Sequence, residues 1–383
     1  MPTPTLTPAG KPVTPAPTEF IGDPNAKELR LPSGSPIGKL AVYAVEVRIA
    51  STVDRAWPTR EVRAFDTGDS KEWAAFTYGG LDDYPVGEQL AGGRTVVVAT
   101  ERYVALQSLE TGARREIYRA PNDVQVDSFS VSHDTTLVAV AVRAIDYGQS
   151  FTELMIFDIS GGTGAAAKLV RTFDKSTVSL GGWFSYPQWL AGDVGLMVVG
   201  AAPKDGPGGR ATVFMDGTSR PEIPEWRLTS PNGQFAWRSG ATSCFGLQRE
   251  ELTIVDAVSD EPLGVYSEPG RFVEASEWAR DSSAILFFSY ADATGGCDVA
   301  QARNWGLLPV QGGPAIPVAD PETVRRAWDA EPFFKLTCPG SGTSFAGADN
   351  DSLSCEHIEA GELTIDSVAV GQASRVRTLG LVP

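Results

Sequence analysis

Two sequence patterns could indicate a hydrolytic site or a nucleotide-binding site. A serine nucleophile on a strand-to-helix turn requires Gly-x-Ser-x-Gly, and the nearest match, between Gly342 and Gly347, has the wrong spacing. A phosphate-binding loop must close on Gly-Lys followed by Ser or Thr. The glycine-rich run from Gly161 to Lys168 lacks that ending and is better interpreted as a hairpin loop. These patterns therefore predict no catalytic residue and no nucleotide cofactor.

Histidines and paired carboxylates give no stronger signal for catalysis. The chain has two histidines, of which His133 occupies a turn sequence with no partner that its spacing would identify. We interpret His133 as a turn residue. The neighbours Asp82 and Asp83 could support glycosidic hydrolysis, but adjacent acidic residues are expected in a chain that has 48 of them. A histidine-rich metal site is not expected.

Calcium is the one ion for which the sequence offers candidate ligands. Asp349 and Asp351 flank an asparagine in a loop between two cysteines, and they present the oxygen atoms that calcium prefers. The loop lacks the glycine and the distal glutamate of an EF-hand. We expect a solvated loop and no cofactor, with a structural calcium at these two aspartates as the alternative.

Four cysteines, Cys244, Cys297, Cys338 and Cys355, are the disulfide candidates. None of them forms Cys-x-x-Cys, which excludes zinc-ribbon and thioredoxin-type interpretations. An even count fits two disulfides and an oxidising compartment. Pairing Cys338 with Cys355 and Cys244 with Cys297 is favoured by proximity, although three pairings are possible and four reduced, buried cysteines are the alternative.

Composition indicates a turn-rich β protein with no affinity for polyanions. The 383 residues include 40 Gly and 27 Pro, and 42% are hydrophobic, which is ample for a core. Apolar runs at helical spacing are nearly absent. The net charge of −16 argues against binding nucleic acid or an anionic membrane surface.

A repeated group of four short β-rich runs organises the chain. It is clearest at 126–134, 136–142, 153–162 and 168–173, where turn sequences separate the runs. Related groups recur from about residue 38 onward. The third run of each group ends in a marker residue, and successive markers are 40 to 58 residues apart: Asp66, Ser108, Asp158, Asp216, Asp256, Pro309 and Asp366.

Repeats of this length with four strands each predict a β-propeller. A four-stranded sheet cannot bury both faces alone, so successive blades must pack against each other. We predict an all-β fold, a single propeller of seven blades of four antiparallel strands at 38–383, with six blades as the alternative. The strand near 376–381 is expected to close the ring by pairing with the N-terminal blade. The marker aspartates are expected to bond the turn backbone.

Residues 1–37 are expected to form a largely disordered tether and lead-in. Their Pro and Thr content fixes an extended backbone and cannot build a core. The sequence contains no apolar signal segment or membrane helix. Either a removed N-terminal signal or anchor preceded this sequence or the protein is cytoplasmic, and the tether and the cysteines together favour the first, an extracytoplasmic protein tethered to the cell envelope.

The turn at Ser230-Pro231-Asn232-Gly233 resembles the Ser-Pro-Asp-Gly turn of TolB-like β-propellers, with Asn232 in place of the acidic residue. In that family an aromatic residue often precedes the turn, as Trp278, Phe129 and Trp189 do here. The four-run groups are also WD-repeat-like, but the Gly-His and Trp-Asp dipeptides of WD-repeat propellers are absent. The resemblance implies an extracytoplasmic scaffold for protein contacts.

Aromatic residues in or beside expected loops are the candidate binding face: Trp57, Tyr84, Tyr147, Trp183, Tyr186 and Trp305. The alternative is that they pack between blades. We expect a monomeric, non-enzymatic scaffold that binds a protein partner or small ligand on one propeller face. The alternative is a lyase, lactonase or glycosidase with a site at the central channel mouth.

Overall fold

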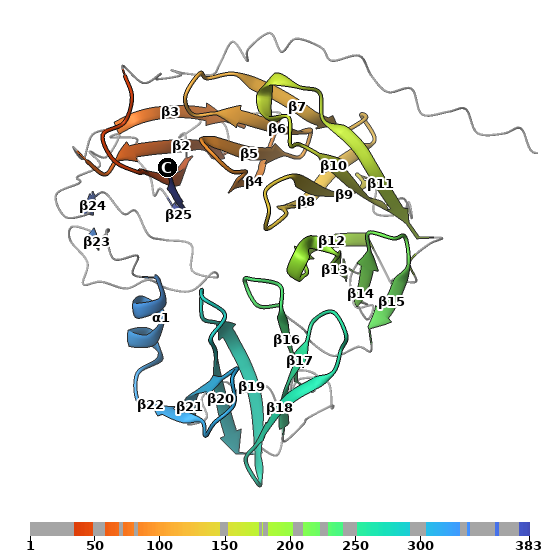
Figure 1. Cartoon of the computed structure of the whole chain (residues 1–383), viewed down its shortest axis with the longest axis vertical. Coiled ribbons are helices and arrows are strands. Elements are labelled where there is room, and N and C mark those ends of the chain that lie inside the picture. The colour runs from red at the N-terminus through yellow and green to blue at the C-terminus, as the bar shows by residue number, and fades with distance from the viewer. Residues whose placement is uncertain are drawn as a thin grey trace, which may run out of the picture.

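The computed structural model describes residues 34–48, 58–68, 72–79, 83–145, 152–175, 178, 183–201, 210–222, 229–239, 251–291, 304–329, 335–337, 357–359 and 375–383. Within these ranges the chain forms antiparallel sheets that follow one another around a ring, as Figure 1 shows. The larger sheets are the blades, and their strands follow one another outward from the centre of the ring.

The first three blades are complete four-stranded sheets. Blade 1 contains, from the centre outward, β25 (Arg375–Val382), β1 (Leu40–Arg48), β2 (Pro58–Asp66) and β3 (Glu72–Tyr78). Blade 2 contains β4 (Pro85–Leu90), β5 (Thr95–Thr100), β6 (Tyr103–Ser108) and β7 (Arg114–Arg119). Blade 3 contains β8 (Val124–Val131), β9 (Leu137–Ala144), β10 (Thr152–Asp158) and β11 (Lys168–Asp174), with the 3-10 turn η1 (Gly162–Gly164) before β11.

The remaining sheets continue the ring. Blade 4 contains β12 (Trp183–Trp189), the 3-10 turn η2 (Ala191–Asp193), β13 (Gly195–Ala201), β14 (Arg210–Phe214) and β15 (Ser219–Glu222). Blade 5 contains β16 (Phe235–Ser239), β17 (Glu251–Asp256) and β18 (Pro262–Ser267). Blade 6 contains β19 (Arg271–Trp278), β20 (Ala284–Ala291), β21 (Asn304–Pro309) and β22 (Ile316–Val318). The helix α1 (Pro321–Asp329) and a pair formed by β23 (Lys335–Thr337) and β24 (His357–Glu359) follow.

The predicted all-β propeller is confirmed. Six sheets of three or four strands make at least six blades, and the β23–β24 pair lies between α1 and β25 in the ring (Figure 1). Blade 5 also has an isolated bridge between Thr229 and Ala236, on the inner side of β16.

The ring closes as predicted. β25 pairs antiparallel with β1, from Leu40 opposite Val382 to Glu46 opposite Arg375. Through this pairing, the C-terminal strand becomes the innermost strand of the first blade. A propeller closed in this way hides the edge of β1 that would otherwise stay unpaired.

The core lies between the blades, because the middle strands are buried on both faces. In β5, Val97 packs toward blade 3 with Val138 and Val140 of β9, whereas Val96 and Val98 pack toward blade 1. Side chains alternate between the two faces of a strand. This two-sided burial explains why the second run of each repeat is a continuous apolar stretch and not an alternating one.

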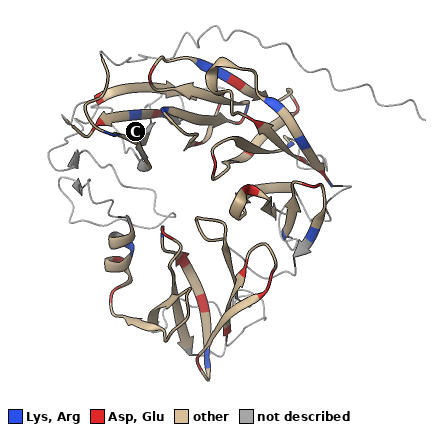
Figure 2. Cartoon of the chain, viewed as in Figure 1, with Lys and Arg blue, Asp and Glu red and all other residues tan. Residues whose placement is uncertain are grey.

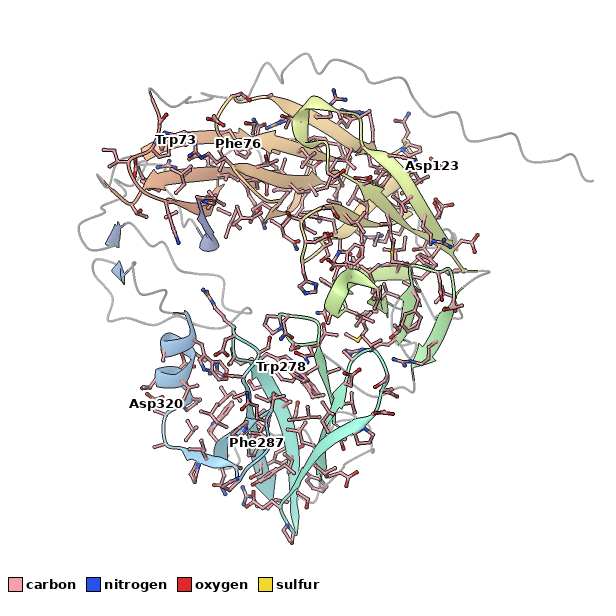
Figure 3. The ribbon with its side chains drawn as sticks, in the orientation of Figure 1. Trp73, Phe76, Asp123, Trp278, Phe287 and Asp320 are labelled. Carbon is pink, nitrogen blue, oxygen red and sulfur yellow. The ribbon has the colours of Figure 1, made fainter. Side chains whose placement is uncertain are left out.

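Aromatic residues before the inner turns also join neighbouring blades. Trp278 stacks on Phe235 of blade 5, with ring centroids 6.4 Å apart, and Phe287 meets the ring of Tyr266 at 4.6 Å. Figure 3 labels Trp278 and Phe287 in its lower part, where both belong to blade 6. The aromatic residues that prompted the TolB-like resemblance therefore have a structural role at blade interfaces.

The expected role of the marker aspartates is confirmed at four of the five positions. Asp158, Asp216 and Asp256 accept backbone N–H bonds of 2.8 to 3.0 Å from the residues two or three positions later. The marker Ser108 acts in the same way, since its Oγ accepts backbone N–H bonds of 3.1 and 3.2 Å. Asp66 accepts from the backbone of Ile37, Gly38 and Gly68. Pro309 has no side-chain acceptor, and Asp366 lies outside the described residues.

The helix α1 was not predicted. Asp320 precedes it, and its carboxylate accepts bonds from Glu322 N (3.1 Å) and Thr323 Oγ1 (2.6 Å). Aspartate as the N-cap followed by Pro321 at the first helical position is a recognised helix start. That short signal could have found the helix, which is only nine residues long.

Several predicted features lie outside the described residues. They include residues 1–33 of the expected tether, all four cysteines, Asp349 and Asp351. In the part of the chain that the structure describes, no helix is long and apolar enough to cross a membrane.

Candidate functional site

A pocket of about 390 Å³ opens beside the inner strands of blades 2, 3 and 4. Its walls come from β4 and β8, from the turn at Glu101 between β5 and β6, and from Arg60 of β2, Arg143 of β9 and Tyr186 of β12. Three inner strands of neighbouring blades thus contribute to one cavity. We consider it the candidate functional site.

β-Bulges in the three inner strands shape the pocket. The pairing register shifts at Val86 in β4, at Asp127 in β8, and at Tyr186 and Pro187 in β12. A bulge adds a residue that the partner strand does not pair, and it re-aims the side chain there. Val86, Asp127 and Tyr186 all line the pocket as a result.

A buried carboxylate lies on the blade 1 side of the pocket. Glu88 of β4 is only 2% exposed. Its Oε2 accepts a hydrogen bond of 3.1 Å from Arg60 Nη1 and another from the hydroxyl of Tyr78. Burial, followed by the charge of Glu88, raises the pKa of Tyr78 well above its usual value, so this hydroxyl remains a donor at neutral pH.

A second carboxylate, Asp127, is held by four donors at the β8 bulge. Oδ1 accepts from Arg143 Nε at 3.0 Å and from the indole N–H of Trp183 at 3.2 Å. Oδ2 accepts from Ser185 Oγ at 2.5 Å and from Ser128 Oγ at 3.3 Å. The Arg143 guanidinium also lies over the Trp183 ring, 5.1 Å from its centroid. This network fixes the wall between blades 3 and 4.

These contacts limit the chemistry of the two carboxylates. A general acid or base needs a proton-accepting oxygen that can reach the substrate and a pKa suited to the task. Glu88 and Asp127 are each paired with an arginine and bonded by further donors. Both residues therefore help to fix the shape of the pocket.

Two tyrosines form the exposed rim of the pocket. Tyr84, just before β4, is 41% exposed, and Tyr186 of β12 is 68% exposed. Tyr186 has a φ of +45°, an unusual value for a residue other than glycine. Its backbone N–H donates a 2.8 Å bond to Ser128 Oγ of blade 3, which holds it in this conformation. Strain of this kind is concentrated at functional sites.

The structure brings three of the six sequence-predicted aromatic residues to one place. Tyr84 and Tyr186 line the pocket, and Trp183 bonds to Asp127 in its wall. Trp305 lies in blade 6, packed against Phe288 at 5.0 Å and beneath Arg325 at 5.2 Å. Trp57 and Tyr147 lie outside the described residues. Sequence reasoning missed Glu88, Asp127, Glu101 and both arginines, which no motif marks.

His133 has partners that its sequence spacing could not reveal. Its Nδ1 lies 2.9 Å from Asp193 Oδ1 of blade 4, and its Nε2 lies 3.1 Å from the carbonyl oxygen of Pro231 at the start of blade 5. Asp193 also accepts the backbone N–H groups of His133 and Asp134 at 3.0 Å. This turn therefore links three consecutive blades. Among the described residues, no group of three His, Cys, Asp or Glu side chains could hold a metal ion.

Comparisons with known proteins bear on the fold alone. No family model and no curated protein matches the chain. An oligogalacturonate lyase from Vibrio parahaemolyticus is similar at a TM-score of 0.41 and 13% identity, over 76% of this chain and 83% of the other. A putative TolB from Agrobacterium tumefaciens is similar at a TM-score of 0.35 and 14% identity, over 73% of this chain and 89% of the other. The Cps50 (Swd1) β-propeller domain of Myceliophteria thermophila is similar at a TM-score of 0.38 and 12% identity, over 61% of this chain and 76% of the other. The chain spans 61% of a matched chain in a mitotic checkpoint complex.

Proposed function

We propose that this propeller is a non-enzymatic scaffold that binds a protein or small-molecule ligand at the pocket of blades 2 to 4. One observation carries the proposal. The carboxylates of Glu88 and Asp127 are held by arginines, while Tyr84 and Tyr186 project from the rim of the pocket. Rigid aromatic side chains around a fixed polar floor are typical of binding sites.

The sequence supports an envelope location for this scaffold. The Pro- and Thr-rich N-terminal segment would act as a tether, and the even number of cysteines fits an oxidising compartment. The net charge of −16 disfavours nucleic acid as a partner. We propose a monomeric, extracytoplasmic propeller attached through an N-terminal anchor.

Site-specific photocrosslinking tests the binding pocket. A benzophenone amino acid replaces Tyr186 in the full chain, and the matched control replaces Val265, which is 60% exposed on β18 of blade 5. The proteins are illuminated with envelope extract from the source organism. We expect crosslinked species at position 186 that are absent at position 265 and that decrease when Tyr84→Ala is added. Equal capture at both positions would contradict the proposal.

The enzyme alternative makes a different prediction at the same pocket. A panel of lactones, uronide oligosaccharides and aryl glycosides is incubated with the native protein and with Asp127→Asn. The scaffold proposal expects no turnover by either protein. Turnover that the native protein shows and Asp127→Asn loses would overturn it and assign the carboxylate a chemical role.

A further inference from the structure

We infer that the pocket receives a lysine or arginine side chain from an extended segment of a partner protein, an inference that rests on the proposed function. The observation behind it is the charge balance of the pocket wall. Three carboxylates line the cavity, those of Glu88, Glu101 and Asp127, against the two guanidinium groups of Arg60 and Arg143.

The two arginines are already occupied by two of the carboxylates. Arg60 pairs with Glu88 at 3.1 Å, and Arg143 pairs with Asp127 at 3.0 Å. Each guanidinium is therefore balanced by one carboxylate, which leaves the described lining of the pocket with one net negative charge. The third carboxylate, Glu101, makes no side-chain hydrogen bond or ion pair with the described residues. A cationic group entering the pocket would complete the pairing.

The backbone fixes Glu101 at the pocket. Its N–H donates a 2.8 Å bond to the carbonyl oxygen of Tyr84, and its carbonyl oxygen accepts a 2.8 Å bond from Val126 N of blade 3. Glu101 thus joins the rim tyrosine to the inner strand of the next blade. The anchored backbone keeps the base of the Glu101 side chain at the pocket, so a cationic ligand can pair with its carboxylate without a rearrangement of the main chain.

The rim tyrosines suit the same ligand. A guanidinium or ammonium group is attracted to the face of an aromatic ring, and Tyr84 and Tyr186 supply two exposed rings at the opening. The cavity of about 390 Å³ lies near the lower end of the usual range for ligand pockets, about 300 to 1,000 Å³. One long side chain fits this size, whereas a folded domain does not.

The electrostatic potential of the whole protein also favours a cationic ligand. The chain carries a net charge of −16, and Figure 2 shows acidic residues on blades all around the ring. A negative protein concentrates cations near its clefts and repels anions from them. A basic partner segment would therefore associate faster at low salt than at high salt.

Blocked tripeptides test the inference directly. The probes are Gly-Arg-Gly and Gly-Lys-Gly, and the neutral control carries citrulline, which keeps the shape of arginine but not its charge. Binding to the full chain is measured by NMR titration, which detects weak affinities. We expect the charged peptides to bind about tenfold more tightly than the citrulline peptide, and less tightly as salt increases.

Two variants with the same change in net charge locate the effect. Glu101→Gln is expected to weaken binding of the arginine peptide about tenfold and to abolish the preference over citrulline. Glu251→Gln removes an exposed carboxylate on β17 of blade 5 and should change neither. Equal binding of the arginine and citrulline peptides, or equal effects of the two variants, would overturn the inference.

The photocrosslinking experiment separates this failure from failure of the proposed function. Ligand capture at position 186 without any preference for cationic peptides would leave the pocket as a binding site and refute only the ligand class. If position 186 captures no ligand and cationic peptides show no preferential binding, the binding site itself is refuted.

Discussion

The indole N–H of Trp189 donates a 3.1 Å hydrogen bond to the carbonyl oxygen of Ser130, across the boundary between blades 4 and 3. Aromatic residues at equivalent positions make contacts at other blade boundaries in the ring. Phe129 lies against Gly87 of blade 2, and Trp278 stacks on Phe235 of blade 5. In each case the aromatic residue of one inner strand contacts the preceding blade. The aromatic residue before the turn therefore works as a contact between blades.

Replacing Trp189 with phenylalanine tests that contact. Trp189→Phe keeps an aromatic ring but removes the donor, and it leaves space in a site where the side chain is 3% exposed. We expect the free energy of unfolding to fall by about 1 to 3 kcal/mol, measured by chemical denaturation. Trp73→Phe is the control, because its indole N–H donates to Gly34 O at an exposed position. An equal loss of unfolding free energy in Trp189→Phe and Trp73→Phe would contradict the role of Trp189 as a contact between blades.

The turn carboxylate Asp66 makes stability depend on acid. Burial would raise its pKa, but the backbone N–H groups of Gly68, Ile37 and Gly38 outweigh burial and hold the pKa below its usual 3.8. A folded-state pKa below the unfolded one contributes stability that is complete above the unfolded value. That contribution disappears as the pH falls through the lower, folded value.

Asp66→Asn should therefore destabilise the fold most at neutral pH. We expect a loss of about 1.5 to 3 kcal/mol, since bonds to a charged acceptor are replaced. The gap between the thermal midpoints of variant and native protein should be constant near neutrality and narrow as the pH drops below 3.8. Asp123→Asn, which removes an exposed carboxylate, serves as the charge control. A gap that widens in acid would refute the predicted sign.

The closing strand has one position where a side chain cannot be added freely. Gly380 of β25 has a φ of +139°, and a Cβ there would lie 3.0 Å from Leu90 Cδ1 of blade 2. Gly380→Ala should lower the free energy of unfolding by about 1 to 3 kcal/mol through backbone strain and crowding. Gly264→Ala in β18 meets open space and should have a smaller effect. Thermal denaturation of the two variants decides between these outcomes.

Tyr186 offers a test that separates strain from ligand contact. Glycine tolerates its φ of +45°, whereas alanine does not. Both Tyr186→Gly and Tyr186→Ala remove the rim ring and should weaken peptide binding equally. The glycine variant should be more stable than the alanine variant by about 1 kcal/mol, measured by denaturation at the same pH. Equal stabilities would show that the backbone there is unstrained.

The sequence was sufficient to predict the repeat, and through it most of the strands. Apolar runs such as 95–99 and 136–142 mark strands that are buried on both sides, and turn residues such as Asp158 mark where strands end. These features are local, so a single repeat contains the information. The closing partner of β1 was also predictable, because a ring of blades leaves one edge unpaired.

The pocket could not be predicted in the same way. Its shape depends on bulges at Val86, Asp127 and Tyr186, and a bulge follows from register between strands, which no local pattern fixes. Glu88 and Arg60 meet across two blades. His133 and Asp193 are 60 residues apart and come together only because their turns lie side by side in the ring.

The pairing of β25 with β1 sets an order of events during protein synthesis. About 330 residues separate the two strands, so at about 5 to 20 residues per second the ribosome needs on the order of half a minute to make the second after the first. During that interval β1 presents an unpaired edge that another nascent chain could join. The innermost strand of the first blade is among the last to arrive, which makes the completed ring a product of the whole chain and leaves no separately finished N-terminal half.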